Sequence, residues 1–167
     1  MKAKQQEFLN LIEKHKGILH KVSKMYMDNV EDQNDLVQEI VLQLWHSYDR
    51  FEGNSQFSTW MYRVSLNTAL TYFKKEKKKS THYTFLENID RVDDHDPSEK
   101  ETQLELFYIA VHQLNKVEKA LIFLFLEGQS HKEIGRNLGI TEVNARVKLN
   151  RTKDKLQTII KTYGYEF

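Results

Sequence analysis

The sequence predicts an all-α protein built from two small helical domains joined by a flexible acidic linker. Residues 18–52 contain no glycine or proline, and the whole chain has a single proline, so little interrupts helix formation. Residues 1–80 carry 13 cations and 10 anions, residues 81–102 carry 2 and 7, and residues 103–167 carry 10 and 7. We therefore expect an N-terminal domain at 1–80, a linker at 81–102, and a C-terminal domain at 103–167 with a helix-turn-helix.

Composition narrows the class of protein. Of the 167 residues, 40% are hydrophobic and 11% aromatic, which is enough to form buried cores. The chain has no cysteine, so disulfides and thiolate metal sites are excluded. No apolar run approaches the ~18 residues of a membrane span, and the N-terminus lacks the apolar stretch of a signal peptide. We expect a cytoplasmic protein with no membrane insertion.

The clearest helix of the N-terminal domain is predicted at residues 32–48. Its apolar side chains recur at helical spacing and form a wide stripe, which consists of Leu36, Val37, Ile40, Val41, Leu44 and Trp45. Asp35, Gln38 and Glu39 fall outside this stripe. Their chemistry alone favours a solvated surface over a binding site.

An aromatic and polar loop is predicted at residues 48–57, with Ser58 as the cap of a helix over about 58–79. One stripe of this helix carries Trp60, Arg63, Asn67, Thr71 and Lys74, and five of the six residues 74–79 are lysines. Cations suit the last turn of a helix, but five exceed what the helix dipole needs. Lysines combined with an aromatic loop favour phosphate contact and base stacking on single-stranded nucleic acid.

The middle block, residues 81–102, holds Pro97 and shows no sustained apolar period. Residues 93–96 gather three aspartates and a histidine, but their spacing matches no calcium loop. We interpret the block as a linker and expect neither a metal nor a cofactor.

The C-terminal domain contains the pattern of a helix-turn-helix. Gly128 suits a helix end, and Ser130 with Glu133 forms a capping box, so a helix should begin near His131. Its inward residues would be Ile134 and Leu138, with Gly135 leaving room for close approach of the next helix. Gly139 closes this helix, and Thr141 is placed to cap the second.

The second helix has two distinct faces. Ala145, Leu149, Thr152 and Leu156 share one side, which we assign to the core. Val143 and Val147 lie opposite, with asparagines beside them and cations on both flanks. Exposed branched methyls can pack on thymine, asparagine can read adenine, and lysine or arginine can neutralise phosphate. This arrangement favours base reading, although a rotated helix would instead bury the valines and leave the cations as a solvated face.

Taken together, these motifs resemble a bacterial RNA polymerase sigma factor of the extracytoplasmic-function group. The first motif is Asp35-Leu36-Val37-Gln38-Glu39, followed by Leu44-Trp45. The second consists of Phe51, Gly53 and Ser55, then Phe57-Ser58-Thr59-Trp60-Met61-Tyr62-Arg63-Val64, and then Asn67. The third is the terminal helix-turn-helix. The resemblance covers about residues 8–79 and 104–160. It implies a factor with no catalytic activity, whose partners are core RNA polymerase and promoter DNA, and it leaves open whether an anti-sigma factor is a further partner.

The resemblance also implies roles for matching residues. Asp35, Gln38 and Glu39 would dock on the clamp of the largest polymerase subunit, which replaces the interpretation as solvated surface, and the flap of the second subunit is a further expected contact. Promoter melting and −10 recognition would use Arg50, Phe51, Asn54, Ser55, Phe57, Trp60, Arg63, Asn67, Lys74 and Lys75. The −35 element would be read by Val143, Asn144, Arg146, Val147, Lys148, Asn150, Arg151 and Lys153.

Several positions depart from the usual pattern of the family. Leu114-Asn115 stands where Leu-Pro is common, Gly135 replaces an alanine, and Val143-Asn144 replaces a small Gly-Thr pair. The last change lies on the reading face, so the −35 preference cannot be transferred from better-known members. Lysines at 74–79 replace an arginine run, which keeps the charge but loses bidentate phosphate geometry.

Two other functions fit the sequence less well. A dimeric helix-turn-helix regulator would bind an operator without polymerase, but it should carry an apolar dimerisation helix or an effector domain, and neither is found. A metal-dependent nuclease needs convergent histidines or carboxylates, whereas the seven histidines are scattered without ligand spacing.

Overall fold

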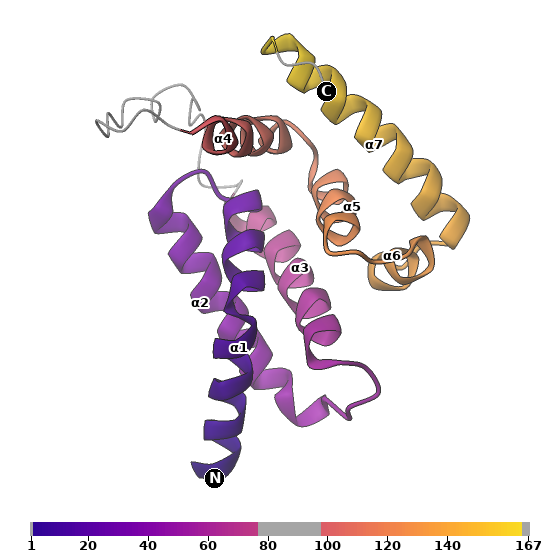
Figure 1. The fold of residues 1–167 in the computed structure, drawn as a ribbon. Coiled ribbons are helices and arrows are strands. Elements are labelled where there is room, and N and C mark those ends of the chain that lie inside the picture. Colours follow the sequence, from indigo (N-terminus) through magenta and orange to yellow (C-terminus); the bar gives the residue numbers. More distant parts are fainter. Residues whose placement is uncertain (1, 77–97, 165–167) are drawn as a thin grey trace. The chain divides into compact units, whose positions relative to one another are not determined.

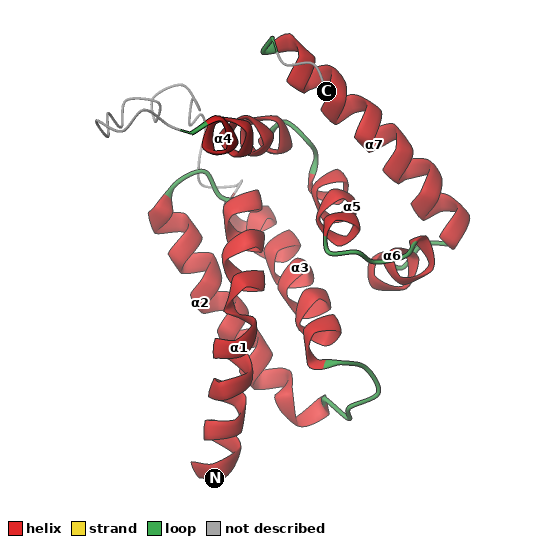
Figure 2. Ribbon diagram, viewed as in Figure 1, coloured by secondary structure: helices red, strands yellow, loops and turns green. Residues whose placement is uncertain are grey.

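The computed structural model describes residues 2–76 and 98–164 (Figure 1). This part of the chain consists of α-helices, one short 3₁₀ helix and connecting loops, without strands (Figure 2). The chain divides into two compact units, Met1–Thr81 and His82–Phe167. The all-α, two-domain prediction is confirmed, whereas residues 81–97 of the predicted linker lie outside the described residues.

The N-terminal unit packs three helices, α1 (Lys2–Tyr26), α2 (Val30–Ser47) and α3 (Phe57–Glu76), with the 3₁₀ helix η1 (Tyr48–Arg50) after α2. Each of the three α-helices contacts the other two. Along α2, the inner row of the predicted stripe is fully buried and consists of Leu36, Ile40 and Leu44. The outer row, Val37, Val41 and Trp45, is only half-buried.

An aromatic cluster holds the loop before α3 in place. The ring of Phe8 on α1 lies 5.0 Å from Trp45 and 5.1 Å from Tyr48. Phe51 continues the cluster, with its ring 5.1 Å from Trp60 and 5.7 Å from Phe57. All three helices and the loop thus share one set of aromatic contacts, which positions the loop against α3.

The third helix begins one residue earlier than predicted. Phe57 is its first residue, so Ser58 lies within the first turn and is not the cap. Phe57 is 8% exposed, and burial of its ring favours a helix that starts at this position. Lys74 and Lys75 fall in the last turn of α3, while residues 77–79 of the lysine run lie outside the described residues.

The C-terminal unit contains α4 (Glu99–His112), α5 (Lys116–Leu126), α6 (His131–Leu138) and α7 (Glu142–Thr162). The first of these begins inside the segment predicted as linker. Ser98 accepts a hydrogen bond from the Glu101 N–H, and the Glu101 carboxylate accepts one from the Ser98 N–H. This capping box is a local helix-start signal, and it moves the beginning of the helical unit to Glu99.

The helix-turn-helix forms at α6 and α7 as predicted. Ser130 and Glu133 form the capping box of α6, Gly139 ends it with φ of 68°, and the Thr141 hydroxyl accepts from the Asn144 N–H. A Cβ on Gly135 would lie 2.7 Å from the Ile140 carbonyl oxygen. The missing side chain is therefore what lets α6 approach the turn this closely.

No helix in the described ranges is long and apolar enough to cross a membrane.

Candidate nucleic-acid and polymerase interfaces

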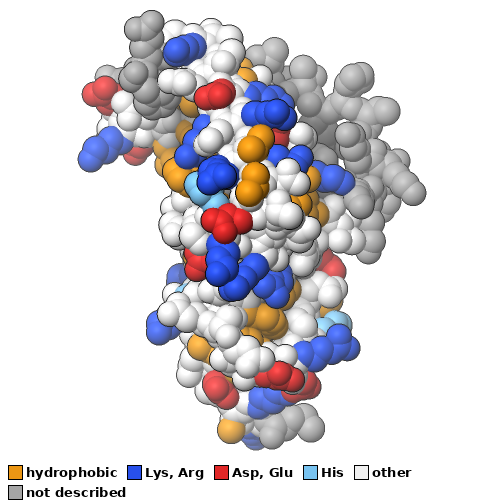
Figure 3. Space-filling model, turned by 90° about the vertical axis from the view of Figure 1, so that its right-hand side faces the viewer, with side chains coloured by type: hydrophobic (Ala, Val, Ile, Leu, Met, Phe, Trp, Pro, Cys, Tyr) orange, Lys and Arg blue, Asp and Glu red, His pale blue; other side chains and the backbone are white. Residues whose placement is uncertain are grey.

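The outer face of α7 exposes two branched side chains. Val143 is 59% and Val147 40% exposed, whereas Ala145 and Leu149 are fully buried. The helix is therefore rotated as predicted, which excludes the alternative in which the valines belong to the core. Figure 3 shows Lys and Arg side chains gathered around hydrophobic ones on the face that contains α7. This combination of methyl groups and surrounding cations can meet a DNA groove and its flanking phosphates.

The cations of α7 differ in their surroundings. Arg146, Lys148 and Arg151 are exposed, as are Asn144 and Asn150 among the predicted reading residues. Lys153 is half-buried, and its ammonium lies 3.5 Å from the centre of the Phe125 ring on α5. Lys153 is thus in a cation–π contact, and its predicted role at the −35 element would require it to leave this ring.

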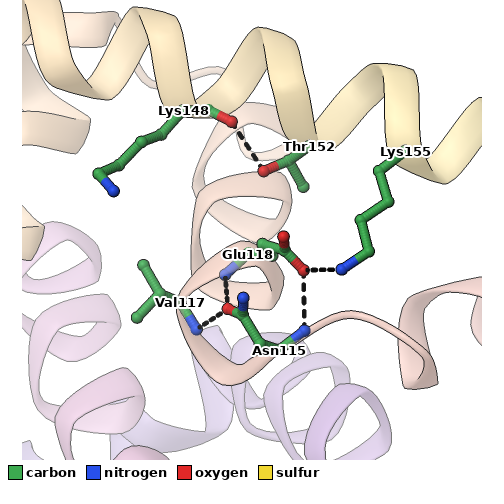
Figure 4. A network of polar contacts seen from close by, with 6 residues as sticks. All are labelled: Asn115, Val117, Glu118, Lys148, Thr152 and Lys155. Atoms are coloured by element: carbon green, nitrogen blue, oxygen red, sulfur yellow. Dashed lines mark hydrogen bonds and ion pairs between the residues drawn. The ribbon is translucent and has the colours of Figure 1, made fainter.

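A polar network joins the start of α5 to α7 (Figure 4). Lys155 Nζ donates to Glu118 Oε2 at 2.8 Å, and the same carboxylate oxygen accepts from the Asn115 N–H at 2.9 Å. Asn115 Oδ1 accepts in turn from the N–H groups of Val117 and Glu118. Asn115 thereby starts α5 with a capping box where the family commonly has proline.

Glu118 is held in its charged form by this network. Partial burial on its own raises the pKa of the Glu118 carboxyl, but the hydrogen bonds from Lys155 and Asn115 and the charge of Lys155 together lower it. A partly exposed ion pair of this kind contributes about 0.2–1 kcal/mol. The ion pair therefore helps to orient α7 on α5 and adds little to the overall stability of the protein.

The loop between η1 and α3 presents polar groups. Gly53 has φ of 72°, which makes the turn, and Arg50, Asn54 and Ser55 are exposed. Phe51 is half-buried within the aromatic cluster, and Phe57 is buried. Of the predicted −10 residues in the loop, the polar ones form the surface, while Phe57 supports it from the core.

A polar groove of about 500 Å³ runs between α2 and α3. It brings Arg50 and Asn67, both predicted for −10 contact, beside Glu39, which was predicted for polymerase binding. Trp60 and Arg63 do not line this groove; Trp60 is half-buried and Arg63 is exposed on α3. The groove is also lined by residues to which the sequence assigned no contact with DNA or polymerase, which are Gln43, His46, Ser47, Thr68 and Tyr72. The sequence indicates that these residues belong to separate helices, but only the packing of α2 against α3 brings them to the same groove.

An apolar groove of about 550 Å³ lies between α1 and α2. Gln38, a predicted polymerase-binding residue, lines it, and Asp35 is exposed on the same helix. Leu9 is 55% and Leu42 46% exposed, so the groove is open to a partner. The remaining lining residues are Gln5, Phe8, Val37, Val41 and Trp45. The contribution of α1 to this surface was missed, because no local signal shows which helix will pack beside α2.

Comparisons with known proteins agree with this architecture. Sigma-70 region 2 matches residues 11–79, and sigma-70 region 4 matches residues 104–156. The RNA polymerase sigma factor NccH of Alcaligenes xylosoxydans xylosoxydans is 24% identical over 95% of this chain and 89% of its own length. The ECF RNA polymerase sigma factor SigW of Bacillus subtilis is 24% identical over 93% of this chain and 90% of its own.

Two solved structures share the fold. The sigma factor RpoE of Bartonella quintana, in complex with the anti-sigma factor NepR, matches with a TM-score of 0.72 and 19% identity over 96% of this chain and 98% of that one. CnrH in complex with the cytosolic domain of CnrY matches with a TM-score of 0.65 and 19% identity over 95% and 90%. With regions 2 and 4 present in order along one chain, the protein belongs to the sigma-70 family, as a sigma factor of the extracytoplasmic-function group.

Proposed function

We propose that this sigma factor reads the −35 element of its promoters with the outer face of α7. The observation that carries the proposal is the pair of exposed valines flanked by cations on the second helix of the helix-turn-helix, the position that enters the major groove in such motifs. Val143, Asn144, Val147 and Asn150 would contact base edges. Arg146, Lys148 and Arg151 would contact phosphates.

The N-terminal unit would act on the −10 element. The loop between η1 and α3 would receive a base flipped out of the duplex, at an unstacking cost of a few kcal/mol that new contacts offset. Arg50, Asn54 and Ser55 would line the loop side. Trp60, Arg63, Asn67, Lys74 and Lys75 would extend the contact along α3.

Core RNA polymerase would bind the surface of α2. Asp35, Gln38 and Glu39 would contact the clamp of the largest subunit, and the apolar groove beside Gln38 would bury hydrophobic side chains of that partner. Apolar area contributes about 25 cal/mol per Å² removed from water, so the groove can add affinity that the three polar side chains alone would not. The flap of the second subunit would contact the C-terminal unit.

This function places the protein in the cytoplasm and assigns it no catalytic activity of its own. An anti-sigma factor is a candidate regulator, since RpoE of Bartonella quintana was solved in complex with one.

The decisive test combines association with transcription. The purified protein should co-elute with core RNA polymerase. In a pool of random promoter sequences, the complex should produce run-off transcripts from only a defined subset. Core polymerase alone should give no such subset. If the chain binds DNA as a dimer and leaves polymerase selectivity unchanged, the operator-binding regulator is the correct description.

A further inference from the structure

Two lysines of α7, Lys153 and Lys155, contact residues near the two ends of α5. Lys153 lies over the Phe125 ring near the end of α5, at 3.5 Å. Lys155 is paired with Glu118 near the start of α5, at 2.8 Å. Because Glu118 and Phe125 are seven residues apart, these anchors are separated by about 10 Å along α5.

The two lysines also stand on opposite flanks of α7. They are two residues apart, which is about 200° around a helix that turns ~100° per residue. Thr152 and Leu156, which stand on either side of this pair in sequence, are buried in the core. Each lysine therefore reaches past one side of the core face toward α5, and neither is on the face that carries Val143 and Val147.

Lys148 provides a contrast on the same helix. In Figure 4 its side chain extends away from Glu118, whereas Lys155 points at the carboxylate. Lys148, Arg146 and Arg151 are exposed. Lys155 is exposed as well, with 46% of its side chain accessible, so what distinguishes Lys153 and Lys155 from these three cations is their contact with a residue of α5.

We propose that Phe125 and Glu118 are specificity-determining residues that withhold Lys153 and Lys155 from the DNA backbone. Phosphate contacts give affinity without sequence information. Engaging two lysines on α5 lowers non-specific binding while the base-reading face stays unchanged, so the ratio of specific to non-specific affinity rises. The inference rests on the proposed −35 function and revises the predicted contact at Lys153.

The proposal makes an unusual prediction, because removing a stabilising contact should strengthen non-specific binding. Glu118→Gln keeps a residue that can serve in a capping box but removes the charge that holds Lys155. Phe125→Leu keeps an apolar side chain but removes the ring under Lys153, and Phe125→Tyr is its matched control because it keeps the ring.

The experiment measures binding of the full-length chain to a 20-bp duplex of scrambled sequence by fluorescence anisotropy at several salt concentrations. Each freed lysine should steepen the plot of log K against log[salt] by about 0.9. Between 50 and 200 mM salt, this corresponds to about 3.5-fold more loss of affinity per lysine. Glu118→Gln and Phe125→Leu should each show this change, and Phe125→Tyr should match the parent.

Double variants identify the lysine responsible. Adding Lys155→Ala to Glu118→Gln should return the slope to that of the parent, and Lys155→Ala alone should leave it unchanged. An unchanged or shallower slope in Glu118→Gln overturns the inference. If Phe125→Leu melts below the assay temperature, Glu118→Gln with its double variant decides the outcome alone.

Failure of the inference can be told apart from failure of the proposed function. A parent chain that gives no promoter-selective transcripts with core polymerase refutes the function. A parent that is selective, but whose Glu118→Gln variant has an unaltered salt slope, refutes only the withholding of the lysines.

Discussion

Gly135 stands where α6 passes closest to the turn leading into α7. A Cβ at this position would meet backbone atoms, the Ile140 carbonyl oxygen at 2.7 Å and the Glu142 nitrogen at 3.3 Å. Backbone atoms cannot move aside as a flexible side chain can. The glycine is therefore required by the spacing of two chain segments, although its own φ is ordinary for a helix.

Gly135→Ala should destabilise the protein by about 1–3 kcal/mol, the usual range for overpacking. Urea unfolding followed by circular dichroism measures the change. Gly17→Ala is the matched control, since a Cβ on exposed Gly17 in α1 meets nothing within 4 Å. That variant should gain about 0.5–1 kcal/mol through helix propensity. Equal effects of the two substitutions would show that the close approach at Gly135 does not constrain the fold.

Glu118 makes stability depend on pH in the acid range. Its hydrogen bonds and the Lys155 charge outweigh burial and lower the pKa of its carboxyl in the folded state. A lowered folded pKa means that the contribution is present above the unfolded value of about 4.3 and is lost as pH falls through the folded pKa. The stability difference between the parent and Glu118→Gln should thus be at most about 1 kcal/mol at pH 7.

That difference should shrink as pH falls below about 4 and vanish when the carboxyl is protonated. Unfolding curves between pH 3 and pH 7 provide the measurement. Glu105→Gln, at an exposed position on α4, is the control for loss of a carboxylate. A difference that is constant over this range would exclude the ion pair as its source.

At the scale of the element, α7 combines a buried core face with an exposed face that we propose reads the −35 element. Ala145, Leu149, Thr152 and Leu156 are buried, as the helical period predicts. Val143 and Val147, on the opposite side of the same helix, are exposed. Such a helix can be docked rigidly by its inner side and still offer its outer side to DNA.

Replacing Arg146 and Arg151 by alanine should weaken binding to promoter duplex and flatten the salt slope by about 1.8, since two phosphate contacts are lost. Anisotropy titrations at graded salt measure the slope. Lys161→Ala removes a cation near the end of the same helix and should change the slope less. If the double arginine variant keeps the slope of the parent, neither residue contacts phosphate.

The surface of α2 has two parts, an exposed polar row and an apolar groove shared with α1. Asp35→Lys with Glu39→Lys should abolish association with core polymerase, because both charges in the proposed interface are reversed. Gel filtration with core enzyme measures association. Binding of the same variant to scrambled duplex should remain, and Glu105→Lys in the other unit serves as the matched charge change. Unchanged co-elution would remove Asp35 and Glu39 from the interface.

At the scale of the whole molecule, each unit has its own hydrophobic core. Leu36, Ile40, Leu44 and Met61 are fully buried in the N-terminal unit, and Leu124, Ile134 and Leu149 in the C-terminal unit. If both units contact DNA as proposed, linking them raises affinity, because the second unit is at high effective concentration once the first has bound. The two units together would therefore recognise a promoter better than either alone.

Residues 1–81 and 82–167, produced as separate proteins, should each be helical and melt cooperatively, because each retains its own core. Circular dichroism melts provide the measurement. Added together to core polymerase, they should support less promoter-specific transcription than the linked chain. A unit that is unfolded on its own would show that its core depends on the other.

Local signals accounted for most of the architecture. The capping box at Ser130 and Glu133, the positive φ at Gly139 and the cap at Thr141 were all predictable, because each acts within four residues along the chain. The errors were also local. Ser58 resembled a cap but lies inside α3, and the capping box at Ser98 was hidden within an acidic segment interpreted as linker.

The sequence by itself determined the helices α2, α3, α6 and α7, the turn between α6 and α7, the face of α7 that is buried and the family to which the chain belongs, because periodicity and capping are properties of neighbouring residues. The tertiary structure alone decided that Phe57 is buried, that α1 completes the apolar groove, and that Lys153 and Lys155 are engaged by α5. Those outcomes depend on side chains that meet across helices, and a pattern along one helix does not specify the partner opposite it.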